Sequence, residues 1–368
     1  MYKFILKSFI VWRIGILIIA GLAIKFVPVF SHNYFGGGYS KYIIDPLFWG
    51  HFNFDGEHYL SIVQNGYLPL QYFFFPVFPI LMRFFSVNVG LFVSNLFFFL
   101  ALIGIYKLVI LDYEEKVAKL VIILLLLFST SFYFGVYYTE SLFLMLIIWA
   151  FYFARKKNFL LASLIATLGS ATRIIGVVMF PVLIIEYFLS RKEQKPRNWT
   201  LASILIAPLG LLIYMYYLFK KTGDALIFLH QITIFGEQRS STLILLPQVI
   251  YRYIFKILPH VSYSYFPNVF TTYLEFTIAI LFLILIIFSF FKLRLSYSIY
   301  AFFVYLIPTF AGSFSSMPRY VLIIFPVFIL LGVYLNKIPK VYLYAIFSVM
   351  LILLAISETL FWRGYWLS

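Results

Sequence analysis

The sequence contains no cysteine, and only 11% of its 368 residues are charged. Without cysteine the chain forms no disulfide framework and offers no thiolate for nucleophilic chemistry or metal binding. Soluble globular domains carry about 25% charged residues, and about 45–50% of their residues are apolar. Because 64% of this chain is hydrophobic and 22% is aromatic, a soluble globular fold is excluded.

Nucleotide-binding and metal-binding motifs are also missing. The chain has no phosphate-binding P-loop, no dinucleotide-binding glycine pattern and no HExxH zinc motif. It shows no internal repeat of fixed period and no low-complexity tract. We therefore expect a single integral membrane domain over residues 1–368, whose substrate arrives through the membrane rather than as soluble ATP or a nucleotide sugar.

Long apolar runs separated by short charged segments make up most of the chain. Apolar runs of about 17–25 residues have the length of a membrane-spanning α-helix. A transmembrane β-barrel would instead show alternating segments of about ten residues, and these runs do not alternate. The sequence therefore predicts an all-α, polytopic transmembrane protein with about eleven spans. The basic N-terminus resembles a signal peptide, but its apolar stretch is long and no cleavage site is evident, which indicates a retained first span.

The order of the apolar runs predicts where these spans and two large loops lie. The loops cover about residues 31–88 and 220–268, and each includes a short interfacial helix, "YFFFPVFPILMRFF" and "LPQVIYRYIFKILPH". The run between residues 159 and 189 is too long for one ordinary helix, so we expect two short spans that meet at Arg173. The remaining spans are expected at about 9–30, 89–111, 117–131, 139–154 and 200–219, with three or four more after residue 268.

The net charge of +15 does not indicate nucleic-acid binding, because the basic residues lie at the ends of apolar runs. Lys and Arg are densest in short segments such as "RKKN" and "SRKEQKPRN", which the positive-inside rule places in the cytoplasm. Both large loops and the C-terminus are then expected on the extracytoplasmic face. If the chain is prokaryotic, the membrane is the plasma membrane.

This orientation gathers the candidate functional residues on one face of the membrane. Charged groups at membrane depth are costly, and they usually mark function or a paired structural role. A carboxylate near the surface offers a general base, and an arginine offers a clamp for phosphate. The candidates are Asp45, Asp55, Glu57 and His58 in the first loop, Glu140 and Arg173 at span ends, His230 and Arg239 in the second loop, and Arg319 after "SSMP".

Each candidate also has a simpler structural explanation. Asp55 precedes a glycine, as turn residues do, and Glu57 and His58 suit a solvated loop. Glu140 follows Thr139 where a helix N-terminus favours a carboxylate. Arg173 and Arg319 suit arginines whose side chains extend to the membrane surface. A lone histidine such as His230 is more often structural. Although the first-loop carboxylates offer oxygen ligands to a divalent cation, their spacing matches no metal motif, so no metal or other cofactor is predicted.

Several segments resemble one known family when they are taken together and in order. "FDGEHYLSIVQNGY" followed by "FFFPVFPILMR" is similar to the "WDxxHYxxIAxxGY…FFPLYPxLxR" segment of PIG-V-type mannosyltransferases, which belong to the GT-C superfamily. The similarity continues through "YYTESLFLMLIIWAFYFARKKNFLLASLIATLGSATRIIGVVMFPVLIIEY" and "GDALIFLHQ" and ends at "MPRYVLIIFPVFILLG". One departure is Phe54, where the family usually has tryptophan.

The resemblance implies an inverting glycosyltransferase that uses a polyprenyl-phosphate-linked sugar, normally mannose, on the extracytoplasmic face. Asp55 matches the family's aspartate base, with His58 beside it. Glu140, Arg173 and Arg319 match the positions of its "SES", "TR" and "PRY" motifs. The expected partners are the lipid-linked donor, a glycan or glycolipid acceptor and the bilayer.

Two functions of other classes stay open at this stage. A flippase or transporter of a lipid-linked sugar would place polar groups along the interiors of its spans, which are nearly free of them here. A structural membrane protein whose polar loops bind a partner would not need Asp55 for its function. Asp45 lies in the same loop as Asp55, and only the resemblance separates the two as candidates for the base.

Overall fold

The computed structural model describes residues 1–368 except 31–32, 34, 194–198, 232–238, 241 and 368. The described residues form helices and connecting segments without any β-strand, which confirms the all-α prediction. In chain order the elements are α1 (Tyr2–Phe26), α2 (Tyr39–Ile44), α3 (Pro46–Trp49), η1 (Gly50–Phe52), α4 (Asp55–Asn65), α5 (Val77–Met82), α6 (Val87–Val109), α7 (Glu115–Leu127), η2 (Ser131–Gly135), α8 (Glu140–Arg155), α9 (Phe159–Ser170), η3 (Ile174–Val178), α10 (Met179–Glu193), α11 (Trp199–Ile204), α12 (Leu209–Thr222), α13 (Ile227–His230), α14 (Leu246–Arg252), η5 (Tyr253–Ile257), η6 (Leu258–His260), α15 (Phe266–Lys292), α16 (Leu295–Thr309), α17 (Met317–Tyr320), η7 (Val321–Ile323), α18 (Phe325–Leu335) and α19 (Lys340–Trp362).

The long apolar helices are those of a membrane-embedded, polytopic protein. Within the described residues, five helices are long and apolar enough to cross a membrane: α1, α6, the run 174–191 that combines η3 with α10, α15 and α19. A sixth candidate is the pair 317–323 and 325–335, which is bent by 78°. The other expected spans correspond to shorter helices, among them α9 and α16.

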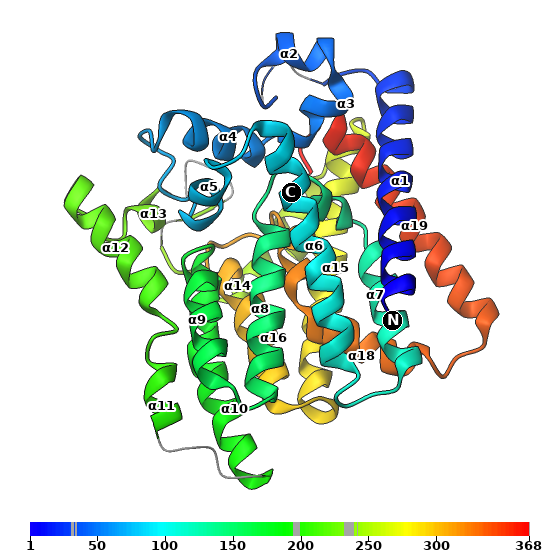
Figure 1. Ribbon diagram of the computed structural model, residues 1–368. Coiled ribbons are helices and arrows are strands. Elements are labelled where there is room, and N and C mark those ends of the chain that lie inside the picture. The colour runs from blue at the N-terminus through cyan, green and yellow to red at the C-terminus, as the bar shows by residue number, and fades with distance from the viewer. Residues whose placement is uncertain (31–32, 34, 194–198, 232–238, 241, 368) are drawn as a thin grey trace.

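The helices pack as a bundle, with α1 and α19 at one edge and α11 and α12 at another (Figure 1). α7, α8 and α18 carry apolar residues on most of their circumference and are largely buried, as expected of helices surrounded by other helices. α1 and α19 pack against each other and bury only a narrow stripe of residues. Their remaining apolar surface suits contact with lipid.

The first large loop is folded rather than extended. It holds α2, α3, η1, α4 and α5, which lie together at one end of the bundle in Figure 1. α5 coincides with the short aromatic helix that the sequence predicts there. α14 and η5 coincide with the second expected loop helix, and they carry exposed apolar side chains such as Phe255.

The predicted hairpin around Arg173 is confirmed. α9 ends at Ser170, and the chain then turns through residues 171–173 into η3 and α10, which pack back on α9. The expected span at 200–219 is also interrupted, because α11 and α12 are separate helices on either side of Pro208. Proline lacks an amide hydrogen and breaks the hydrogen-bond ladder of a helix, which explains this interruption.

Candidate active site

A cavity of about 400 Å³ lies where α4, α8 and α17 begin and α16 ends. Its lining includes charged residues such as Asp55 and Arg319 together with many aromatic and aliphatic residues. The described charged lining consists of three arginines and two carboxylates: Arg173, Arg239, Arg319, Asp55 and Glu140. These residues come from five separate regions of the sequence, and all five are among the candidates that the sequence singled out.

Arg319 connects the two carboxylates of the cavity. Its Nη1 donates to Oδ2 of Asp55 at 2.6 Å, and its Nε lies 3.5 Å from Oε1 of Glu140. The short helix α17, with Pro318 at its start, brings this guanidinium to the first turn of α4. The partners are 264 residues apart in the sequence, so this contact joins the first loop to the C-terminal third of the bundle.

Arg173 completes this network from the break between α9 and η3. Its Nη1 donates to Oε1 of Glu140 at 2.7 Å and lies 3.4 Å from the hydroxyl of Thr139. Thr139 occupies the N-cap position of α8, as the sequence predicts, but its side chain makes no capping hydrogen bond. Its hydroxyl instead contacts Arg173 and the hydroxyl of Tyr59, 3.3 Å away.

The side chains of this network differ in how much of their surface is exposed. The Asp55 side chain is 21% exposed and that of Arg173 is 14% exposed, so both reach the cavity. The Glu140 side chain also borders the cavity but is only 2% exposed. Glu140 therefore acts as the buried counter-ion that orients Arg173 and Arg319, whereas Asp55 has the access that a ligand needs.

Arg239 reaches the cavity from the second large loop. The amide of Ser240 donates to the carbonyl of Ala311 at 2.8 Å, and this backbone contact fixes the segment beside the end of α16. Arg239 Nη2 then donates to the hydroxyl of Ser316 at 3.0 Å and lies 3.5 Å from the hydroxyl of Tyr320. Within the described residues Arg239 has hydroxyl partners but no carboxylate partner, so its charge is not neutralised by an ion pair.

The electrostatic surroundings keep Asp55 ionised. Burial alone would raise the pKa of this carboxyl group, because a low-dielectric environment disfavours the charged form. The nearby cations outweigh burial, with Arg319 the strongest and with His58 and Arg239 contributing, and they hold the pKa of Asp55 below its usual value. Asp55 is therefore an available proton acceptor throughout the neutral pH range.

The apolar lining of the cavity comes from several segments. The run before α5 supplies three consecutive phenylalanines, α13 supplies Phe228 and Leu229, and the end of α16 supplies a proline and a phenylalanine. Isoleucines at the start of η3 and Leu243 complete it. Phe75 packs edge-on against Phe228, with ring centroids 5.4 Å apart. The cavity thus combines charged and apolar lining residues, which suits an amphipathic ligand.

The remaining candidates lie outside the lining of the cavity. Asp45 is exposed and caps α3, where its Oδ1 accepts a hydrogen bond from the amide of Phe48 at 3.0 Å. His230 is a largely exposed side chain whose Nδ1 lies 2.6 Å from Oδ2 of Asp224. Glu57 follows Asp55 on α4, and burial raises the pKa of Glu57.

His58 is not part of the described cavity lining, but it contacts a residue that is. Its ring stacks on Phe74, a residue of the cavity wall, with ring centroids 4.8 Å apart. It also contributes to the lowered pKa of Asp55. Within the described part of the chain, the first-loop candidates do not converge on a common point, and no group of three His, Cys, Asp or Glu side chains is placed to hold a metal ion.

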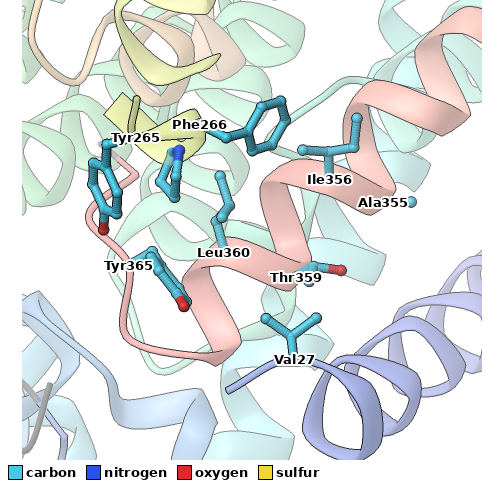
Figure 2. Close-up of a pocket in the computed structure, with 9 residues that line it drawn as sticks. Val27, Tyr265, Phe266, Ala355, Ile356, Thr359, Leu360 and Tyr365 are labelled. Atoms are coloured by element: carbon cyan, nitrogen blue, oxygen red, sulfur yellow. The ribbon is translucent and has the colours of Figure 1, made fainter. Parts of the chain in front are cut away.

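A second cavity, of about 490 Å³, lies beside the C-terminal ends of α1 and α19 and the N-terminal end of α15 (Figure 2). Its described lining contains no charged side chain and consists mainly of apolar residues and tyrosines, such as Leu360, Tyr265 and Tyr365. Thr359 adds one hydroxyl group. This cavity lacks the acids, bases and cations of the first one, so it is not a candidate active site.

Several residues of the first cavity were not predicted from the sequence. Tyr59, Thr139 and Tyr320 line it, and the hydroxyl groups of Ser316 and Tyr320 accept hydrogen bonds from Arg239. Tyr320 directly follows Arg319, and Tyr59 directly follows His58, so adjacency to a charged candidate was the available signal. Tyrosine is common throughout this chain, with 30 residues, and its composition therefore gave no reason to single these out.

The chain matches no protein-family model and no curated protein.

Proposed function

We propose that this chain is an inverting glycosyltransferase that moves a sugar from a polyprenyl-phosphate donor to a glycan or glycolipid acceptor on the extracytoplasmic face. Mannose is the sugar that the family resemblance favours. One observation carries the proposal: Asp55 and three arginines line a cavity whose other lining residues are largely aromatic and aliphatic. An anionic lipid that carries a sugar has the same division into a polar and an apolar part.

The charge balance of the cavity favours a phosphate ligand. Its described lining has three guanidinium groups and two carboxylates, which leaves one positive charge in excess. Among the described residues of the lining, Arg239 is the arginine without a carboxylate partner, and guanidinium groups bind phosphate oxygens in bidentate geometry. A sugar phosphodiester carries one negative charge and would balance this excess.

The reaction follows from these positions. The acceptor hydroxyl oxygen attacks the anomeric carbon of the sugar, and a new glycosidic C–O bond forms as the bond from that carbon to the phosphate oxygen breaks. The hydroxyl proton passes to the Asp55 carboxylate, which acts as general base. The electron pair of the broken bond stays on the lipid phosphate, whose negative charge the arginines stabilise. Attack opposite the leaving group inverts the configuration.

Donor binding would also strengthen the base. In the unliganded protein Arg319 donates to Asp55, and this contact lowers the affinity of the carboxylate for a proton. A donor phosphate that competes for the Arg319 guanidinium loosens the pair, so the carboxylate becomes more basic when the sugar is in place. The apolar wall beyond the arginines would hold the start of the prenyl chain.

The same proposal includes the GT-C architecture with eleven crossings and the site on the extracytoplasmic side. The crossings would be α1, α6, α7, α8, α9, α10, α11 with α12, α15, α16, the bent pair that ends in α18, and α19. The helices that begin or end at the cavity would then share one membrane face. Short helices such as α9 cross only if the bilayer adapts to them.

The test is transfer of labelled mannose from polyprenyl-phosphate-mannose in membranes that contain the wild type, Asp55→Asn or Asp45→Asn. Extracted membrane lipids and glycans serve as the acceptor pool. We expect Asp55→Asn to lose at least about 100-fold in rate, because a general base contributes about 10²–10⁴-fold. Asp45→Asn is the matched control, since asparagine also caps helices and Asp45 lies outside the cavity lining.

Three other outcomes would contradict parts of this proposal. A normal rate in Asp55→Asn would remove Asp55 as the base. Loss of transfer only in Asp45→Asn, at unchanged protein level, would move the base to Asp45. Failure of the wild type with a panel of prenyl-linked sugars would overturn the glycosyltransferase reading and favour transport or partner binding.

A further inference from the structure

The backbone directly before Asp55 has an unusual conformation. Phe54 has φ 55° and ψ −117°, although it is not a glycine. A positive φ places the β-carbon of a bulky residue against its own backbone, and such strain persists only where surrounding contacts enforce it. Those contacts are visible here, because the Phe54 ring packs against Phe361 and Trp366 at centroid distances of 5.6 and 5.4 Å.

Tyr138 fixes the backbone on both sides of this strained residue. Its hydroxyl donates to the carbonyl of Asn53 at 2.7 Å and accepts from the amide of Asp55 at 3.1 Å. The Asn53 side chain in turn donates to the carbonyl of Phe361 at 3.0 Å. The buried hydroxyl group of Tyr138 thus connects the two residues that flank Phe54, and Phe361 of α19 contacts the same segment.

Tyr138 also touches the partner of Asp55. The guanidinium carbon of Arg319 lies 5.7 Å from the centroid of the Tyr138 ring, which is the distance of a cation–π contact. The same side chain therefore restrains the backbone that carries the carboxylate and the cation that pairs with it.

We propose that Tyr138 is a positioning residue that sets the direction of the Asp55 carboxylate by holding residues 53–55, and this inference rests on the glycosyltransferase function proposed above. Asp55 is the first residue of α4, so its side-chain direction follows from the backbone at this point. Tyr138 itself contacts no substrate. It acts through the position of the base, and its hydroxyl is the part that matters.

The experiment compares Tyr138→Phe with Tyr137→Phe in the mannose-transfer assay. The first variant removes only the bridging hydroxyl, and the second removes the hydroxyl of an equally buried neighbour whose ring packs on Phe52 and Phe78. We expect Tyr138→Phe to lower kcat about 10- to 100-fold, because small misplacements of a catalytic group cost about that much. The donor KM should stay within about twofold, since the arginines and the apolar wall are unchanged.

The split between kcat and KM distinguishes positioning from general damage to the fold. A Tyr138→Phe protein with wild-type kcat would overturn the inference, and so would an equal loss in Tyr137→Phe. If Tyr138→Phe does not accumulate, Phe54→Ala decides in the same assay: a loss of kcat at unchanged KM supports the inference, and an unchanged kcat overturns it. A wild type that transfers no prenyl-linked sugar overturns the proposed function and this inference with it.

Discussion

At the residue scale, the contact between Asp55 and Arg319 constrains the chemistry more than any other. A carboxylate held by a guanidinium is a weak base, and it becomes stronger when the guanidinium finds another anion. In the proposed reaction, the same pair would link donor binding to base strength. This link has a consequence for the pH dependence of the reaction.

We expect the acid limb of kcat/KM for the donor to lie below the usual aspartate pKa. This limb reports the free enzyme, in which Arg319 lowers the pKa of Asp55, and activity is lost only as the pH falls through that lowered value. The acid limb of kcat reports the donor complex and should lie at higher pH. Both are measured from initial transfer rates across an acidic pH series.

Arg319→Gln provides the control for this pH dependence. Removing the guanidinium leaves burial as the main influence on Asp55, and burial raises the pKa of a carboxyl group. The acid limb of kcat/KM should then move to higher pH, while overall activity falls. An unchanged limb in this variant would show that the limb belongs to another group.

The sequence predicted all five described charged residues of the cavity but not their pairing. Asp55, Glu140, Arg173, Arg239 and Arg319 could be found because charges are rare in this chain and these were expected in the two large loops or near span ends on one membrane face. Their contacts depend on how distant helices pack, and the sequence contains no local signal for that. The strained Phe54 was equally hidden, because its conformation results from packing against α19.

At the scale of elements, a second ionic network ties the helices together away from the cavity. Glu186 on α10 is fully buried and accepts from Arg294 and from the hydroxyl of Ser296 at the start of α16. Arg155, at the end of α8, lies 3.5 Å from the same glutamate and pairs with Asp112 at 2.5 Å. Asp112, in the segment between α6 and α7, joins this network through Arg155.

We expect Glu186→Gln to destabilise the bundle without changing the chemistry. Removing one partner of a buried ion pair leaves the other charges uncompensated, which costs about 3–5 kcal/mol. The apparent midpoint of thermal unfolding in detergent should fall by several degrees, while the donor KM stays unchanged in protein that remains folded. Glu115→Gln is the matched control, because Glu115 pairs with Lys119 on an exposed helix surface and should shift the midpoint little.

A Glu186→Gln midpoint equal to that of the wild type would contradict a stabilising role for this network.

Element boundaries themselves were well predicted for α6 and α8, whose apolar runs end at charged or small residues. The break between α11 and α12 was missed, because apolar composition continues through Pro208 and the expected span treated the run as one helix. The folded first loop was missed as well, since short helices held by tertiary contacts have weak periodicity.

At the scale of the whole molecule, the two ionic networks mark opposite ends of the bundle. α8 starts at Glu140 in the cavity and ends at Arg155 in the second network. Its 16 residues correspond to a length of about 24 Å, which is shorter than the bilayer core of about 30 Å. The helix is largely apolar between these ends.

The absence of cysteine gives a direct test of this arrangement, because single cysteines can be introduced without background labelling. Ser40 and Ser264 are exposed near the cavity end, whereas Lys156 and Asn336 are exposed at the far ends of α8 and α18. In intact cells, a membrane-impermeant maleimide should label Ser40→Cys and Ser264→Cys. It should label Lys156→Cys and Asn336→Cys only after the membrane is permeabilised. Labelling of all four positions from one side would refute the proposed orientation, and the reversed pattern would place the cavity, and the sugar donor that it is proposed to bind, on the cytoplasmic face.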